Sequence, residues 1–193
     1  SEMCIRDRFG YVIKLLGVAK NTEDGIEVKV HPMLIPNNHP LANVNDAFNA
    51  VFVHGKAMDD AMFMGRGAGQ MPTASAVVGD IIDVCRNIVH DSCGRIGCCC
   101  YKNLEVKDIT DTKSKFFLRL EVADKQGVLA NIASVLGNSG VSIAQVVQKS
   151  GKDGVAELVI ITAEVLEKNF NDAMAVFKGL SAVKNIAGVI RVY

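Results

Sequence analysis

A run of closely spaced glycines is the segment of this sequence best suited to hold a ligand. Gly65, Gly67 and Gly69 fall within five residues, after a strand-like segment and before a helical one. Glycine lets the backbone pass close to a bound molecule, and a helix start adds unpaired N–H groups and a partial positive charge. A tight strand-to-helix turn would use the same residues, so both interpretations stand at this point.

The spacing of these glycines excludes two common phosphate-binding motifs. A dinucleotide-binding turn has the form G-x-G-x-x-G within a strand–helix–strand unit, and a P-loop ends in Gly-Lys followed by Ser or Thr. Neither pattern occurs in Gly65–Thr73. Arg66 could pair with an anion, although solvent or a neighbouring side chain are the commoner partners of arginine in such a loop.

A second turn whose residues could bind a ligand covers Asp124 to Gly127, between an alternating apolar segment and a helical one. The Asp124 carboxylate could receive the ammonium of an amino acid, while N–H groups at the helix start meet its carboxylate. Aspartate is favoured as a helix cap or turn residue as well, so a purely structural role is an equal alternative.

The cysteines and histidines do not form a pattern typical of a metal or catalytic site. Zinc ligands are usually spaced as C-x2-C pairs, and secreted disulfide frameworks spread their cysteines along a short chain. We expect free thiols in a reducing compartment, with His90 and Cys93 leaving an adventitious metal site as the alternative. None of the histidines has a patterned carboxylate partner. The residues are Cys4, Cys85, Cys93, Cys98, Cys99 and Cys100, with His31, His39, His54 and His90.

The composition argues against two classes of partner. The 21 basic and 21 acidic side chains cancel, and tryptophan is absent, so neither a polyanion-binding surface nor an aromatic base-stacking platform is expected. No apolar run approaches the roughly 18 residues of a membrane span. No secretory signal opens the chain. We expect a cytoplasmic protein that binds neither nucleic acid nor membranes.

The first part of the chain, Phe9 to Asn87, predicts strands that lead into one helix. Ile13–Gly17 and Ile26–Val30 alternate between apolar and other residues and flank a turn-like cluster, which predicts a hairpin. The second strand is expected to end at His31-Pro32, because proline lacks the donor that a strand ladder needs.

Two further apolar segments and a helix complete this part. Ala50–Val53 and Ala61–Met64 are expected to be buried strands. From Val77 to Val89, apolar residues recur at helical spacing in two stripes, which predicts a helix packed between layers.

The second part of the chain predicts strands and helices in the order βαββαβ. About eighty residues suit one antiparallel sheet covered on one face by two helices, and a second copy could cover the other face. The expected elements are 116–122, 129–136, 141–148, 156–162, 170–177 and 183–192.

Several segments carry a resemblance to known families. Leu120–Ala130 resembles the opening of an ACT domain, in which the strand-to-helix loop faces a small effector. Upstream segments, in the appropriate order, resemble homoserine dehydrogenase. These are Phe9–Ala19, Val30–Pro32, His39–Ala42, Phe48–Val53 and Gly65–Ser75.

The resemblance implies an α/β (α+β) fold, with a partial mixed-sheet catalytic domain followed by a βαββαβ ferredoxin-like ACT domain. Residues 1–8 have no counterpart in the family. Residues 9–89 would be the C-terminal part of the catalytic and dimerisation domain, residues 90–113 a cysteine-containing linker, and residues 114–193 the ACT regulatory domain.

The resemblance implies a function and its site residues as well. Homoserine dehydrogenases interconvert aspartate 4-semialdehyde and homoserine with NAD(P), in threonine, methionine and isoleucine biosynthesis. They are homo-oligomers, and threonine is the effector expected by analogy. The implied cofactor-binding residues are Gly69 first, then Gly67, Ala68 and Thr73. The implied effector-binding residues are Asp124, Gly127, Val128 and Leu129.

The family's dinucleotide fingerprint, catalytic lysine and substrate-binding acidic residues would lie before the equivalent of Phe9. We therefore expect a truncated chain that is inactive by itself, and we assign it no catalytic residue. Lys14 is interpreted as a structural residue of a strand. A non-catalytic ACT protein that binds an amino acid and acts through a partner is the alternative.

Overall fold

The computed structural model describes residues 9–95, 97, 103–149 and 154–193. They form two compact units, one from the described residues of Ser1–Pro36 and Leu104–Tyr193 and the other from those of Asn37–Asn103. The longest described helix has 20 residues, and none of the described helices combines the length and apolarity needed to cross a bilayer.

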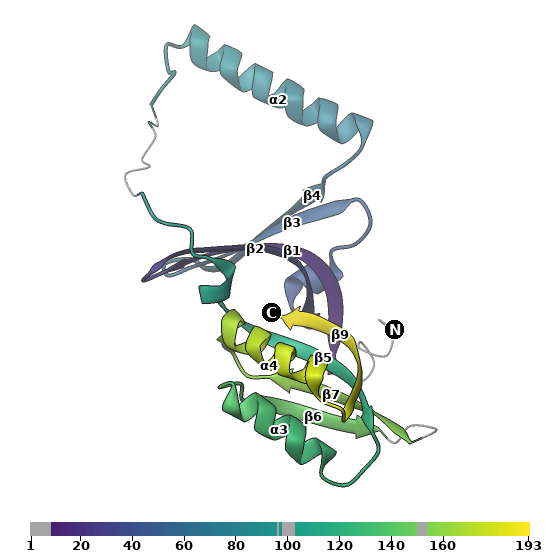
Figure 1. The fold of residues 1–193 in the computed structure, drawn as a ribbon. Coiled ribbons are helices and arrows are strands. Elements are labelled where there is room, and N and C mark those ends of the chain that lie inside the picture. The colour runs from purple at the N-terminus through teal and green to yellow at the C-terminus, as the bar shows by residue number, and fades with distance from the viewer. Residues whose placement is uncertain (1–8, 96, 98–102, 150–153) are drawn as a thin grey trace. The chain divides into compact units, whose positions relative to one another are not determined.

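The first unit contains the predicted βαββαβ order (Figure 1). Its sheet has the strand order β9-β5-β7-β6, and each neighbouring pair is antiparallel. A short strand, β8, precedes the second helix and pairs with the start of β5. The elements are β5 (Lys113–Ala123), α3 (Val128–Asn138), β6 (Ile143–Lys149), β7 (Val155–Thr162), β8 (Val165–Leu166), α4 (Glu167–Gly179) and β9 (Val183–Val192). The sequence prediction of a ferredoxin-like ACT fold is thereby confirmed.

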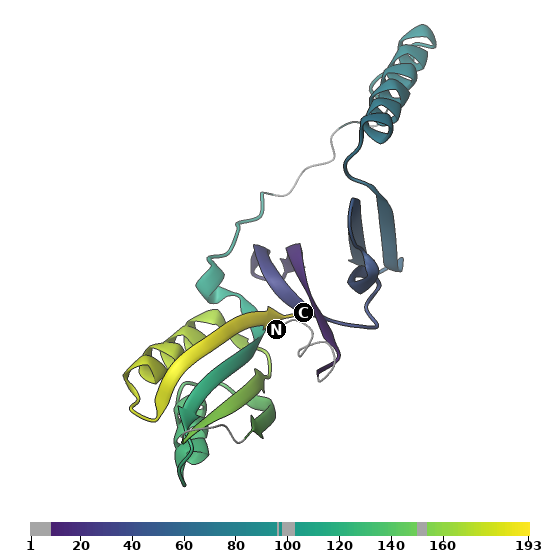
Figure 2. The same ribbon diagram turned by 90° about the vertical axis from the view of Figure 1, so that its right-hand side faces the viewer.

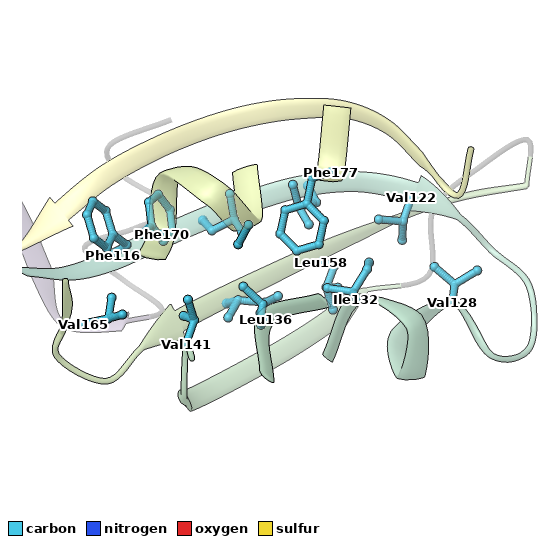
Figure 3. Packing of buried hydrophobic residues seen from close by; sticks show 14 of the residues in the cluster. Phe116, Val122, Val128, Ile132, Leu136, Val141, Leu158, Val165, Phe170 and Phe177 are labelled. Atoms are coloured by element: carbon cyan, nitrogen blue, oxygen red, sulfur yellow. The ribbon is translucent and has the colours of Figure 1, made fainter. Parts of the chain in front are cut away.

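The main core lies between this sheet and the two helices α3 and α4 (Figure 3). Ile132 and Leu136 project from α3 at the spacing of one helical face, and Phe170 and Phe177 project from α4. The Phe170 ring stacks on Phe116 of β5, with 3.6 Å between ring centroids. Alternation along β5 turns the other set of its side chains to the opposite face of the sheet.

That opposite face is partly covered by the chain's own N-terminal residues. Phe117 and Ile161 belong to a second buried cluster, against which Phe9, Tyr11 and Ile13 pack. The Phe9 and Phe117 rings meet edge to face, with centroids 5.6 Å apart. A second copy of the chain is therefore not the only source of cover for this face.

Tyr11 and Ile13 belong to a hairpin that joins the same sheet, and Phe9 lies just before it. β1 (Tyr11–Thr22) and β2 (Gly25–Pro36) are antiparallel, with Thr22 opposite Gly25 across a two-residue turn. β2 then runs parallel to β9, where Met33 and Leu34 are its paired residues (Figure 2). The predicted hairpin is confirmed, and its strands are longer than the alternating segments indicated.

The prediction that β2 ends at His31-Pro32 is wrong, because Pro32 lies within the strand opposite Leu15. With Thr22 opposite Gly25 at the turn, even-numbered residues of β2 direct their N–H and C=O groups away from β1. The carbonyl of Leu34 accordingly accepts a hydrogen bond of 2.8 Å from the N–H of Tyr193. The missing N–H of Pro32 therefore costs the β1–β2 ladder nothing.

The two faces of β2 are the reverse of what its alternation indicated. Glu27 and Lys29 are buried, whereas Val28 and Val30 are 51% and 64% exposed. The face with the charged residues lies toward the start of β5 and the segment before it. That segment offers polar partners, so charged side chains are buried here with hydrogen bonds.

The segment before β5 is docked on β2. The Ile26 N–H donates to the carbonyl of Glu105 at 2.8 Å, and the Lys107 N–H donates to the carbonyl of Ile26 at 2.9 Å. A short 3-10 helix, η2 (Ile109–Asp111), follows and leads into β5. The latter half of the expected 90–113 connector is thus an ordered part of the first unit.

The second unit consists of a short 3-10 helix, a hairpin and one long helix. These are η1 (Pro40–Asn43), β3 (Phe48–Gly55), β4 (Asp59–Arg66) and α2 (Gln70–Val89). The predicted strands and helix are present, but their predicted burial is wrong for this chain. Val51 and Phe63 are 61% and 66% exposed, and α2 has no buried residue. A two-stranded sheet and one helix supply no second layer of their own.

Candidate cofactor loop and effector turn

The glycine run forms the link between β4 and α2, as its spacing predicted. Gly67 lies beside β3, where its N–H donates to the carbonyl of Ala47 at 2.9 Å. A Cβ atom at Gly67 would collide with the side-chain amide of Asn49. A side chain at position 67 would therefore displace the exposed Asn49 side chain, whatever else approaches the loop.

Gly69 is the N-cap of α2 and has a φ angle of +134°, which L side chains rarely adopt. A Cβ atom there would lie 3.1 Å from Cδ of Pro72. The first helical hydrogen bond runs from the Thr73 N–H to the Gly69 carbonyl at 3.1 Å. Because Pro72 has no N–H, Gln70 and Met71 supply the N–H groups that the first turn leaves outside the ladder.

The remaining residues of the predicted cofactor site lie on the same loop and helix start. Ala68 and Thr73 are both exposed. Arg66 lies over the Phe48 ring, with its guanidinium carbon 5.1 Å from the ring centroid, so a neighbouring side chain is its contact here. The loop thus presents exposed backbone, two N–H donors and a threonine hydroxyl, a surface suited to a polar or anionic group.

The effector turn joins β5 to α3. Gly127 is the N-cap of α3 and is left-handed, with φ +83° and no atom within 4 Å of a Cβ placed on it. The Asp124 N–H donates to the carbonyl of Gly154 at 2.8 Å, and its side chain is exposed. Asp124 is therefore held by its backbone, and Gly127 rather than Asp124 caps the helix.

The two other predicted effector residues differ in exposure. Val128 is buried in the core of the first unit, whereas Leu129 is exposed on the first turn of α3. A ligand at this turn would reach the Asp124 carboxylate and Leu129 directly, with Val128 as a support from beneath. Their assigned roles remain predictions.

The cysteines and histidines provide no metal centre in the described residues. Cys85 and Cys93 are exposed free thiols, and Cys4 and Cys98–Cys100 lie outside the described residues. No three His, Cys, Asp or Glu side chains of the described residues come together as a metal site. His54 does have a carboxylate partner, contrary to prediction: its Nδ1 lies 2.7 Å from Asp60 across the β3–β4 hairpin.

A buried polar network, missed by the sequence analysis, links β2 to the start of β5. The Lys29 side chain is only 4% exposed. Its Nζ donates to the hydroxyl of Thr112 at 3.2 Å, the carbonyl of Lys113 at 2.9 Å and the hydroxyl of Ser114 at 3.1 Å. An ion pair of 3.6 Å joins it to Glu27. The buried ammonium therefore has three hydrogen-bond acceptors and a counter-charge.

The network continues through Ser114 to a second ion pair. The Ser114 hydroxyl donates to Oε1 of Glu167 at 2.7 Å, and Arg191 donates to both oxygens of that carboxylate. Burial raises the pKa of Glu167, but hydrogen bonds from Arg191 and Ser114 and the charges of Arg191 and Lys29 outweigh it. The net effect is a lowered pKa, so Glu167 is an anion at neutral pH.

His31 lies beside this network on β2. Its Nε2 is buried without a hydrogen-bond partner among the described residues. Burial lowers the pKa of His31, the positive charges of Arg191 and Lys29 lower it further, and Glu167 opposes them. His31 is thus neutral at pH 7. No local spacing signals this network, because its members come from β2, β5, α4 and β9.

Comparisons with known proteins agree with this arrangement. The family model described as homoserine dehydrogenase matches residues 3–82, and that described as ACT domain matches residues 110–191. Homoserine dehydrogenase of Pseudomonas aeruginosa is 39% identical over 193 residues, which cover 96% of this chain and 44% of the relative. That of Corynebacterium glutamicum is 40% identical, with 94% and 42% covered. The chain thus spans less than half the length of these relatives.

Solved structures give the same result. The crystal structure of a homoserine dehydrogenase from Thiobacillus denitrificans has a TM-score of 0.86 and 38% identity, covering 97% of this chain and 43% of that one. Homoserine dehydrogenase of S. aureus has a TM-score of 0.60 and 27% identity, covering 98% and 43%. The chain therefore belongs to the homoserine dehydrogenase family over residues 3–82 and carries an ACT domain over residues 110–191.

Proposed function

We propose that this chain forms part of a homoserine dehydrogenase, which interconverts L-aspartate 4-semialdehyde and L-homoserine with a nicotinamide cofactor. The observation that carries the proposal is the match of residues 3–82 to that family, followed by an ACT domain. The relatives at about the same identity all bear this name and align with nearly the whole chain. In the proposed enzyme, residues 9–89 belong to the catalytic and dimerisation domain.

The loop at the start of α2 is the proposed contact with the cofactor, NAD or NADP. Gly69 and Ala68 place exposed backbone at the helix start, and Thr73 adds a hydroxyl one turn further on. The Gln70 and Met71 N–H groups and the helix dipole favour a negatively charged or strongly polar group there. The nicotinamide supplies the hydride chemistry when it is bound, and these residues would orient it.

The ACT domain is proposed to bind a small amino acid, with threonine as the first candidate. The exposed Asp124 carboxylate suits an α-ammonium, and the N-terminal turn of α3 suits an α-carboxylate. Residues 114–193 would be the regulatory domain and residues 90–113 its connection to the catalytic part. We further propose a cytoplasmic homo-oligomer that acts in threonine, methionine and isoleucine biosynthesis.

A chimera tests the proposed activity. This chain would replace the aligned 44% of the Pseudomonas aeruginosa enzyme, and NAD(P)-dependent oxidation of homoserine would be measured. We expect turnover well above that of the Pseudomonas portion alone, and none from this chain alone, because hydride transfer needs a held cofactor and a positioned proton carrier. A chimera that folds and binds cofactor but shows no turnover would count against the proposal.

The same set of proteins tests the alternative function, a non-catalytic ACT protein. A non-catalytic ACT protein would bind an amino acid in calorimetry, yet its chimera would stay inactive while remaining folded. Turnover in the chimera together with amino-acid binding supports the dehydrogenase assignment over this alternative.

A further inference from the structure

The hairpin β1–β2 connects two stretches that match different families. It lies within the homoserine dehydrogenase match, residues 3–82, yet it extends the sheet of the ACT match, residues 110–191. Its backbone pairing with β9 is short, with Met33 opposite Arg191 and Leu34 opposite Val192. So short a ladder leaves side chains to determine how firmly the hairpin is held.

The buried polar network provides a continuous side-chain connection across this joint. Lys29 of β2 donates to Ser114 of β5, and Ser114 donates to Glu167 at the start of α4. Arg191 of β9 completes the chain with two hydrogen bonds to Glu167. One residue from each of four elements is therefore required for the network to be complete.

Burying these charges is a poor way to gain stability alone, because desolvation offsets most of the Coulomb energy. What such a network does provide is a high cost for partial opening. If the start of β5 loosened while the segment before it stayed docked on β2, the Lys29 ammonium would lose its acceptors before water could replace them. The hairpin should then open at the same time as the ACT fold.

We propose that Lys29 is a positioning residue that makes the β1–β2 hairpin and the ACT fold open and close as one cooperative unit. A ligand that stabilises the ACT fold then stabilises the hairpin as well, since both share one opening equilibrium. The state of the ACT domain thereby reaches a strand pair of the homoserine dehydrogenase stretch. This coupling does not depend on which amino acid binds or on the activity of the enzyme.

Hydrogen exchange measured by mass spectrometry on the full 193-residue chain tests the proposal. Ile132→Ala destabilises the ACT core from α3, where Ile132 is fully buried. The core cluster that contains Ile132 includes no residue of the hairpin. We expect the substitution to speed exchange of the β1 and β2 amides by about tenfold or more. In a Lys29→Met background the same change should speed them less than about twofold. Lys20→Met, an exposed lysine of the same hairpin, is the matched control and should retain the full effect.

Two additional variants cover failure to fold. Ile132→Val perturbs the core less, and Ser114→Ala interrupts the network at its bridging hydroxyl with little change in volume. Circular dichroism verifies that each variant is folded. Hairpin exchange that ignores the Ile132 substitutions in the wild-type background would show that the hairpin opens independently. An effect of equal size with and without Lys29→Met or Ser114→Ala would show that the apolar contacts, and not the network, couple the two. Either result overturns the proposal.

Discussion

Arg191 donates two hydrogen bonds to the carboxylate of Glu167, from Nε to Oε1 at 2.6 Å and from Nη2 to Oε2 at 2.7 Å. This two-point contact fixes the planes of both groups, which a single hydrogen bond would not do. The guanidinium also lies over the Phe116 ring, 5.6 Å from its centroid. The last strand is thus joined to the first turn of α4 and to the aromatic pair at one end of the core.

Replacing Glu167 should lower the stability of the folded chain. Glu167→Gln removes the negative charge that balances Arg191, whereas Lys29 keeps its ion pair with Glu27. We expect the free energy of unfolding to fall by about 3 kcal/mol, the usual scale for an uncompensated buried charge. Urea denaturation at pH 7 measures it. The control is Glu164→Gln, an exposed position three residues earlier that should change stability by less than about 0.5 kcal/mol. Equal effects at the two positions would contradict the role given to the network.

The network predicts loss of stability on acidification in two stages. The pKa of His31 in the folded chain is below its ordinary value of 6.5, so the unfolded chain takes up that proton first as the pH falls. The pKa of Glu167 is below its ordinary value of 4.5, so its contribution is lost in a second, more acidic range. Both contributions are fully present at neutral pH.

Denaturation of His31→Gln and wild type at pH 7.5, 6 and 5 examines the first stage. The wild type should lose stability between pH 7 and 5, and His31→Gln should lose less over the same range. His90→Gln, at an exposed position, should follow the wild type. A His31→Gln curve parallel to that of the wild type would mean that His31 is not the group that titrates.

Asp124 is expected to affect binding without affecting stability. Its side chain is exposed and its backbone N–H makes the turn contact, so Asp124→Ala should change the free energy of unfolding by less than about 0.5 kcal/mol. Loss of a charge-assisted hydrogen bond to the ligand ammonium should weaken threonine binding at least about tenfold in calorimetry. Glu121→Ala serves as a control because this acidic residue of β5 lies before the turn. Unchanged affinity after Asp124→Ala would place the ligand elsewhere.

Substitution of Gly127, unlike that of Asp124, is expected to lower stability. A Cβ would meet no atom within 4 Å, but φ is +83°, so Gly127→Ala should cost about 1 kcal/mol through backbone strain alone. Thermal unfolding measures this loss. If Gly127→Asn, which tolerates left-handed backbone better, restores most of the stability and the binding, the glycine is structural. Weaker binding by the folded fraction of both variants would indicate close ligand approach instead.

The cofactor loop is best examined at Ala68. Gly67 and Gly69 have local structural reasons to be glycine, so substituting either confounds folding with binding. Ala68→Leu in the chimera should raise the KM for NAD(P) at least about fivefold with little change in stability, because its side chain is exposed in this chain. Ala76→Leu, on the exposed surface of α2, is the matched control. An unchanged KM would indicate that the cofactor does not approach this loop.

Local periodicity was sufficient to predict most elements of this fold. Alternation along β5, helical spacing in α3 and α4, and turn residues between them predicted the βαββαβ order. The glycine run was correctly placed between a strand and a helix. These features depend on residues a few positions apart, and so they are visible in the sequence.

Burial was predicted less well, because it depends on what covers each face. Val28 and Val30 are exposed and Lys29 is buried, since the acceptors for Lys29 lie more than eighty residues away. No spacing rule connects Lys29 with Ser114 or Glu167. The apolar stripes of α2 predicted a helix correctly. They could not show whether other parts of the chain would cover it, and the described residues leave it exposed.

The proline positions in β2 have a further consequence for how the hairpin joins the sheet. Pro32 and Pro36 flank Leu34 on the side of β2 that faces β9. Leu34 is therefore the one residue among these three that has an N–H to offer on that side. A slip of two residues in either direction would replace this donor with a proline ring and break the pairing. The two prolines thus oppose a slip of two residues in either direction, and they limit the pairing of β2 with any other strand along this edge.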